Sequence, residues 1–122
     1  RDITAHHDGG PLNDKIIVEA LGDPGPGGAH VAYRVTHPVD DGTVYLQNMI
    51  HFQSGDPTKE INGFSNEVLL AIVQDRLAGF EGGPFSTRDN EIALRHVNTA
   101  LELLRRRTAD RVARGVAGKL EP

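Results

Sequence analysis

The feature that most constrains the fold is an uninterrupted helical periodicity from Ser86 to Arg114, a stretch without Pro or Gly. The apolar or small residues at helical spacing are Ile92, Leu94, Val97, Leu101, Leu104, Thr108 and Val112. At 1.5 Å per residue, one helix over this stretch would reach roughly 40 Å, which is long for a small domain. A narrow apolar seam on so long a helix requires a packing partner.

A shorter helix is predicted before it. Ser65 is a suitable N-cap, and Phe64 and Leu69 stand at hydrophobic-staple spacing. The apolar face of this helix comprises Leu69, Ile72, Val73, Leu77 and Phe80. The helix should stop at Gly82-Gly83-Pro84, and so short a turn joins two helices into an antiparallel hairpin.

The unequal lengths of the two helices predict self-association. A first helix of about 15 residues is too short to cover the seam from Leu101 to Val112. A homodimer through the long helices would cover it, and a sheet folded back onto the helix is the alternative. Gly115 and Gly118 stand where a C-cap glycine is expected.

The first half of the chain has the pattern of short strands. We expect a short strand and turn within residues 1–14, a strand over Lys15–Leu21, and a hairpin with arms Ala29–Thr36 and Thr43–Gln53. Such strands form a small antiparallel sheet with one solvated face. The predicted fold class is therefore α+β: an antiparallel β region over residues 1–61 and a helical hairpin over residues 62–122, in one compact, homo-oligomeric unit.

Composition excludes several classes of function. The 122 residues contain no cysteine, so disulfides, thiolate zinc sites and cysteine nucleophiles are excluded. No apolar run has membrane-spanning length and no signal peptide is evident, so we expect a cytoplasmic protein with no membrane partner. Ser65, Ser86 and Thr87 are better explained as helix caps than as nucleophiles. We expect no enzyme activity, metal or cofactor.

The charge is uneven along the chain. The net charge is −4, yet residues 105–114 hold five Arg and one Asp (5 − 1 = +4), which leaves −8 elsewhere. An acidic body disfavours binding to a nucleic acid polymer, whereas a local arginine cluster suits a small anion. The alternative is that these arginines only complement the dipole at the helix C-terminus.

A small-anion site can be built from two ends of the hairpin. Phe80 and Asn90 belong to its tip, and Arg107 and Arg111 lie one turn apart near the other end of the long helix. Within one chain these groups are roughly 25 Å apart, too far for one nucleotide. An antiparallel dimer would bring the tip of one copy beside the arginines of the other and form two equivalent clefts. The alternative for Phe80 is a core position of the hairpin.

Two segments together resemble a known family. The segment NGFSNEVLLAIVQDRLAGFEGGPFSTRDNEIAL (62–94) and the segment RTADRVARGV (107–116) are similar to the phage Thoeris anti-defence protein of the first type. That family shares its hairpin domain with the anti-CBASS protein of the second type. The resemblance covers residues 52–118 well and the upstream pieces LND, GGAH and FQSG more loosely.

The resemblance implies a protein that sequesters a nucleotide signal without degrading it. Such proteins bind cyclic ADP-ribose isomers, notably glycocyclic ADP-ribose, and hold them intact in the host cytoplasm so that the Thoeris effector stays inactive. Members assemble as dimers, and some as hexamers that also take up CBASS cyclic di- or trinucleotides at separate sites. By position, Phe80 matches the base-stacking aromatic and Asn90 the pocket amide, while Arg107 and Arg111 match the phosphate-facing arginines. Arg88 and Asn62 are second-tier matches.

The sequence also departs from the family pattern. The segment SGDPTKEING (54–63) is shorter than expected, Leu103-Leu104 stands where many relatives have Trp, and Thr87-Arg88-Asp89 replaces a more usual Cys-Arg-Glu. Two other functions stay open at this point: an enzyme that degrades the signal, and a helical oligomerisation or protein-binding module whose arginines are merely solvated.

Overall fold

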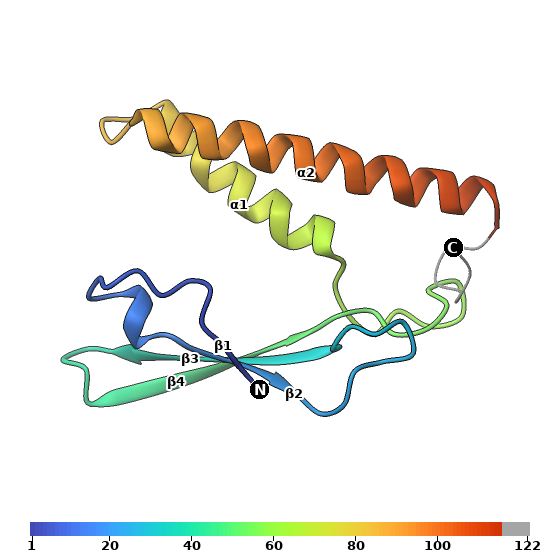
Figure 1. Cartoon of the computed structure of the whole chain (residues 1–122), viewed down its shortest axis with the longest axis horizontal. Coiled ribbons are helices and arrows are strands. Elements are labelled where there is room, and N and C mark those ends of the chain that lie inside the picture. Colours follow the sequence, from blue (N-terminus) through green and yellow to red (C-terminus); the bar gives the residue numbers. More distant parts are fainter. Residues whose placement is uncertain (116–122) are drawn as a thin grey trace. The chain divides into compact units, whose positions relative to one another are not determined.

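The chain forms a small sheet followed by two helices (Figure 1). The structure is a computed structural model that describes residues 1–115. Its elements are β1 (Asp2–Ile3), a 3-10 helix η1 (Asn13–Lys15), β2 (Ile17–Leu21), β3 (Ala32–Val39), β4 (Val44–His51), α1 (Asn66–Glu81) and α2 (Arg88–Ala113). The chain divides into two compact units, Arg1–Gly63 and a second that begins at Phe64. The predicted α+β class is confirmed.

The sheet has four antiparallel strands in the order β1-β2-β3-β4. Each strand pairs with its neighbour in sequence, so every connection is local. Across β2 and β3, Arg34 donates to both carboxylate oxygens of Glu19 at 3.1 and 3.0 Å. This bidentate pair lies between directly opposed residues of the two strands and reinforces their register.

The β3–β4 hairpin differs in detail from the sequence prediction. β3 continues to Val39 instead of ending at Thr36, and it includes Pro38. Pro38 pairs with Tyr45 of β4. On the other side of β3, β2 reaches only as far as its first residue, Ile17, which pairs with Thr36. Because no strand lies beside Pro38 on the β2 side, its missing N–H leaves no partner unsatisfied there. The turn therefore lies at residues 40–43.

The strand predicted over Lys15–Leu21 is also shorter than expected and begins at Ile17. The residues before it form the 3-10 helix Asn13–Lys15. Asp14 accepts hydrogen bonds from the N–H groups of Asp8 and Gly9, both at 3.0 Å. A carboxylate that satisfies local backbone donors competes with extended structure, which explains the later strand start.

The helices begin at the caps that the sequence indicated. The Ser65 side chain accepts from the Val68 N–H at 3.3 Å, and the Thr87 side chain accepts from the Asn90 N–H at 3.1 Å. Of the two expected C-cap glycines, Gly115 follows α2 with a φ of 71°, the left-handed region that glycine favours, and Gly118 lies outside the described residues. A side-chain hydrogen bond links the helices, from Gln74 Nε2 to Asn98 Oδ1 at 2.6 Å.

The Gln74–Asn98 hydrogen bond shows that α1 covers more of the apolar seam of α2 than the sequence predicted. In an antiparallel pair aligned on Gln74 and Asn98, Asn66 lies opposite Arg106, because both are eight residues away (74 − 66 = 106 − 98). Leu101 therefore lies within reach of α1, and it is buried at 6% exposure. The uncovered part of the seam begins further along α2, where Thr108 and Val112 are exposed.

Both units have very little interior. Among residues 1–115, the buried apolar side chains are Ala20 and Leu101. Many large apolar side chains are exposed in both units, including Tyr45, Leu46 and Met49 in the sheet and Ile72, Val73 and Leu103 in the helices. So many exposed large apolar side chains in each unit indicate contacts with other molecules.

Candidate functional site

The tip of the helical hairpin holds two of the predicted site residues. Phe80 lies in the last turn of α1 and Asn90 in the first turn of α2, and the short turn between the helices keeps them at the same end (Figure 1). The ring of Phe80 is 38% exposed, so it is not enclosed in the core of the hairpin. Within residues 1–115, no hydrogen bond occupies the side-chain amide of Asn90. The tip thus presents an aromatic face and an available amide.

Arg88 also belongs to the tip. It is the first residue of α2 and is exposed. In the described part of the chain it makes no ion pair, although Asp89 is its neighbour in sequence. Its guanidinium is available for an anion at the same end as Phe80.

Three further tip residues were missed by the sequence reasoning. The guanidinium carbon of Arg76 lies 5.7 Å from the centre of the Phe80 ring, which is cation–π distance. Phe85, in the turn, is 71% exposed. Glu81 Oε1 is buried without a hydrogen-bond partner among the described residues. The i, i+4 spacing of Arg76 and Phe80 was a signal for the first contact, whereas burial of one oxygen of Glu81 depends on packing alone.

The arginines near the C-terminal end of α2 differ from one another. Arg106 pairs with Glu102 at 3.0 Å and Arg114 with Asp110 at 3.6 Å. Arg107 is exposed and, within residues 1–115, is in no ion pair, while Arg111 is buried at 8% exposure. Arg107 therefore offers the more accessible guanidinium of the predicted pair.

The structure does not bring the tip and the basic end together within one chain. Asn90 and Arg107 lie on the same unbroken helix, and 17 residues at 1.5 Å each place them about 26 Å apart. No bend shortens this path, because α2 contains neither Pro nor Gly. Any site that uses both ends needs a second copy of the chain.

Asn62 has an observed structural role in the sheet unit. Its Oδ1 accepts from the Ser54 N–H and its Nδ2 donates to the Ser54 carbonyl, both at 2.8 Å, while its own N–H donates to Gln53 Oε1 at 2.8 Å. Gln53 Nε2 in turn donates to the Glu60 carbonyl at 2.8 Å. These bonds close the loop between residues 53 and 62. A ligand would compete with them for the Asn62 amide.

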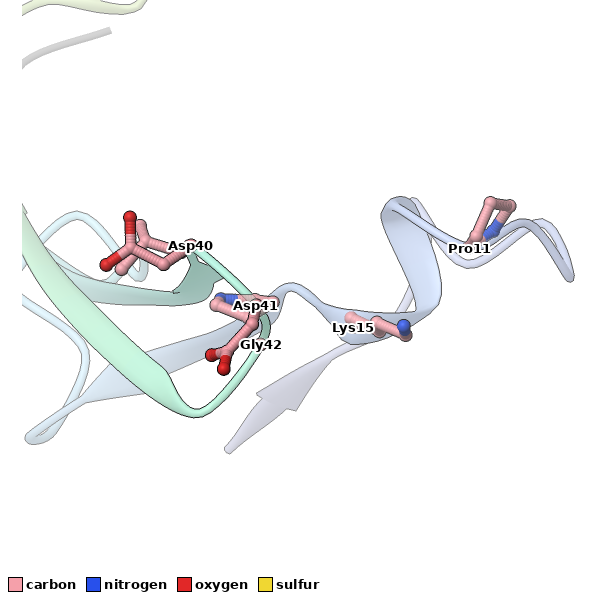
Figure 2. A pocket seen from close by; sticks show the side chains of 7 residues that line it. Pro11, Lys15, Asp40, Asp41 and Gly42 are labelled. Atoms are coloured by element: carbon pink, nitrogen blue, oxygen red, sulfur yellow. The ribbon is translucent and has the colours of Figure 1, made fainter.

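A separate shallow hollow lies in the sheet unit at the β3–β4 turn (Figure 2). It is lined by Pro11, Lys15, Pro38, Val39, Asp40, Asp41 and Gly42. The carboxylates of Asp40 and Asp41 point away from each other (Figure 2). The Asp41 carboxylate accepts from both the hydroxyl and the N–H of Thr43, and these bonds lower the pKa of Asp41. The hollow contains none of the predicted site residues.

The described residues offer neither a cluster of metal ligands nor a membrane-spanning helix. Within residues 1–115, no three His, Asp or Glu side chains lie close enough together to hold a metal ion. No helix in the same part of the chain combines the length and the apolar character needed to cross a bilayer.

The chain is similar to a protein of a Bacillus phage. Over 73 residues the sequence is 41% identical to Thoeris anti-defense 1 of Bacillus phage SBSphiJ7. These residues make up 59% of this chain and 51% of the relative, so the chain spans about half the length of that protein. No protein-family profile matches the chain. The resemblance to Thoeris anti-defence proteins of the first type, first identified from residues 62–94 and 107–116, is confirmed.

Proposed function

Starting from its similarity to Thoeris anti-defense 1, we propose that this chain is a non-catalytic phage protein that sequesters cyclic ADP-ribose-type signals in the host cytoplasm. Glycocyclic ADP-ribose is the proposed ligand. Holding the signal intact would keep the Thoeris effector inactive. Cyclic oligonucleotides of CBASS systems are proposed as additional ligands at separate sites.

The observation that carries the proposal is that an exposed Phe80 and an available Asn90 amide lie at the same end of the hairpin. A purine base stacks favourably on an aromatic face, and a primary amide recognises base edges or ribose hydroxyls. The Arg76 guanidinium near the ring centre restricts its orientation.

The phosphate-binding half comes from the second copy. A pyrophosphate carries two negative charges that match the forked donors of arginine, and Arg107 is exposed and outside any ion pair in residues 1–115. Arg111 lies one turn further along α2. In an antiparallel homodimer through α2, the arginines of one copy face the Phe80 tip of the other, and two-fold symmetry produces two equal sites.

Ligand titration tests the proposal. Calorimetry with glycocyclic ADP-ribose should give saturable heat at one ligand per chain, and heating the complex should release ligand of unchanged mass. Phe80→Leu keeps an apolar side chain but loses the ring, so it should weaken binding by at least about tenfold, the equivalent of one lost stacking contact. Absence of heat with every cyclic ADP-ribose isomer would contradict the proposal.

A matched arginine pair tests the phosphate contact. Arg107→Gln removes the accessible guanidinium and should weaken binding by at least about tenfold, as expected for a lost charge-assisted hydrogen bond. Arg106→Gln is the control, because Arg106 is already paired with Glu102. Equal affinities of the two variants would show that Arg107 is a solvent-exposed arginine that does not contact the ligand.

Mixing variants tests whether one site spans two copies. Phe80→Leu and Arg107→Gln chains, unfolded and refolded together, should form mixed dimers that hold one intact and one doubly altered site. Binding at near-native affinity should then reappear at about a quarter of the wild-type stoichiometry, because half the dimers are mixed and each regains one of two sites. No recovery would contradict a site shared between two copies.

The two other functions predict different results. A signal-degrading enzyme would clear the ligand at substoichiometric protein, and the recovered product would have an altered mass. A plain oligomerisation module would inhibit Thoeris defence equally well with Phe80→Leu or Arg107→Gln.

A further inference from the structure

The free edge of β4 is the longest exposed strand edge of the sheet. β4 pairs with β3 along all eight residues, and in the order β1-β2-β3-β4 no other strand within residues 1–115 pairs with its other side. The opposite edge is formed by β1, which has only two residues. A short edge strand offers little backbone for pairing, whereas an eight-residue edge is a template for another strand.

β4 lacks the features that usually protect an edge. Its sequence, VYLQNMIH, contains no Lys, Arg, Asp, Glu or Pro, and its register with β3 is continuous, without a bulge. Val44, Tyr45, Leu46 and Met49 are each between 47% and 58% exposed. An apolar, uncharged and regular edge strand associates with other strands unless it is covered.

The hydrogen-bond pattern identifies the available backbone groups. The Phe52 N–H donates to the Val31 carbonyl at 2.7 Å. Since antiparallel pairs alternate, the even-numbered residues of β4 exchange hydrogen bonds with β3, and the odd-numbered residues direct N–H and C=O to the free side. The available residues are Tyr45, Gln47, Met49 and His51.

The far end of this edge is partly blocked. A Cβ atom placed on Gly63 would lie 2.6 Å from the His51 carbonyl oxygen, so the backbone of Gly63 closely approaches His51. The open part of the edge therefore runs from Tyr45 to Met49, and its centre is Gln47.

We propose that β4 pairs with β4 of a second copy in antiparallel orientation, with Gln47 opposite Gln47 on a two-fold axis. In this register Tyr45 lies opposite the second Met49, an aromatic–thioether pair that occurs twice. Val44 lies opposite the second Ile50, also twice. The antiparallel direction separates the two acidic turns that carry Asp40 and Asp41, whereas a parallel pairing would place them side by side.

This interface does not depend on the proposed ligand function, because it uses only the sheet unit. Together with an α2-mediated dimer it would give each chain two different two-fold contacts.

A proline substitution tests the pairing without ligand. Gln47→Pro removes an N–H that faces the free edge and no bond to β3, so the sheet should remain folded while the mass by light scattering falls about twofold or more. Gln47→Thr keeps the N–H and should retain the wild-type mass. Leu46→Pro removes an N–H bonded to β3, so its loss of sheet signal in circular dichroism shows that the assay detects unfolding.

Disulfide trapping tests the register. The chain contains no cysteine, so each variant carries a single thiol. Gln47→Cys should cross-link to a covalent pair under mild oxidation, because its two copies face each other across the axis. Thr43→Cys should not, because four residues on each side of the axis separate its copies by roughly 26 Å.

Three results would overturn the proposal. One is a wild-type chain that is monomeric at all concentrations, and another is equal mass for wild type and Gln47→Pro. The third is a concentration-independent fall in melting temperature at unchanged mass, which would assign the edge to a contact within one chain. Failure of ligand binding with an intact Gln47-dependent assembly would contradict only the proposed function.

Discussion

The sheet unit and the helical unit are stabilised in different ways. In the sheet unit, polar side chains hold the loops that contain them: Asp8, Asp14, Asp41 and Asn62 each accept from nearby backbone N–H groups. In the helical unit, side-chain hydrogen bonds are sparse, and the bond that connects the helices joins Gln74 and Asn98. The loops of the sheet are therefore fixed by their own residues, whereas the helices depend on apolar contacts.

This difference indicates where the proposed association would matter most. Each unit buries one apolar side chain among the described residues, Ala20 in the sheet and Leu101 in the helices. The four strands also share an extensive ladder of backbone hydrogen bonds, but two helices gain no backbone bonds from each other. We expect the helical unit to lose more stability than the sheet unit when association is prevented.

The largest effect is expected at the interior of the helical unit. Leu101→Ala should lower the free energy of unfolding by about 3 kcal/mol, because it leaves a cavity where α1 and α2 meet. Urea denaturation followed by circular dichroism at the helical signal measures it. Leu103→Ala removes the same atoms from a side chain that is 54% exposed and should cost less than about 1 kcal/mol. Equal losses would show that Leu101 is not an interior residue.

The matching test in the sheet unit is Gly63→Ala. The added Cβ would overlap the backbone of His51 and Phe52, which cannot move as a flexible side chain can, so a loss of about 1–3 kcal/mol is expected. Thermal denaturation, with the amide signals of β4 followed by NMR, measures it. Gly27→Ala is the control, because nothing lies within 4 Å of its added Cβ. A stable Gly63→Ala variant with unshifted β4 signals would exclude the close approach.

Removal of the α2 cap should have a moderate effect. Thr87→Ala leaves the Asn90 N–H without its side-chain acceptor and should cost about 1 kcal/mol, while Thr87→Ser should be close to neutral. Chemical denaturation of the three proteins measures the difference. Since Asn90 belongs to the proposed site, the alanine variant should also bind glycocyclic ADP-ribose more weakly. A larger loss for serine than for alanine would exclude the cap.

The smallest effect is expected from acid on the sheet unit. The hydrogen bonds from Arg34 lower the pKa of Glu19 below its ordinary value of 4.5. A lowered folded-state pKa means that the contribution of Glu19 is complete above pH 4.5 and is lost as the pH falls through the lower folded value. Melting temperatures from pH 6 to pH 3 should therefore fall less for Glu19→Gln than for wild type. Parallel curves for the two proteins would show that the pair contributes nothing.

Much of the architecture could be predicted because it depends on local signals. Ser65 was predicted as the cap of α1 and either Ser86 or Thr87 as the cap of α2, and the alternation of strand residues predicted the sheet. The ends of β2 and β3 were missed because they depend on neighbours. Pro38 is tolerated in β3 only because no strand lies on its β2 side, and that arrangement cannot be read from residues 36–39 alone.

The candidate site was predictable in part for the same reason. Phe80 and Asn90 were assigned to one end of the hairpin from helix lengths, and both lie there. The resemblance to a known family supplied their proposed roles. The burial of Glu81 Oε1 results from packing, and the hydrogen bonds between Asn62 and Ser54 result from closure of the loop. Neither has a sequence spacing that indicates it.

The unbroken course of α2 makes residue count a determinant of the site. Each residue inserted or deleted between Asn90 and Arg107 would shift the guanidinium by 1.5 Å along the axis and, more importantly, turn it by about 100° around it. A change of one residue would thus direct Arg107 to a different side of the helix. Side chains along α2 can vary with little effect on this geometry, so selection should preserve the length of the helix more strictly than its composition.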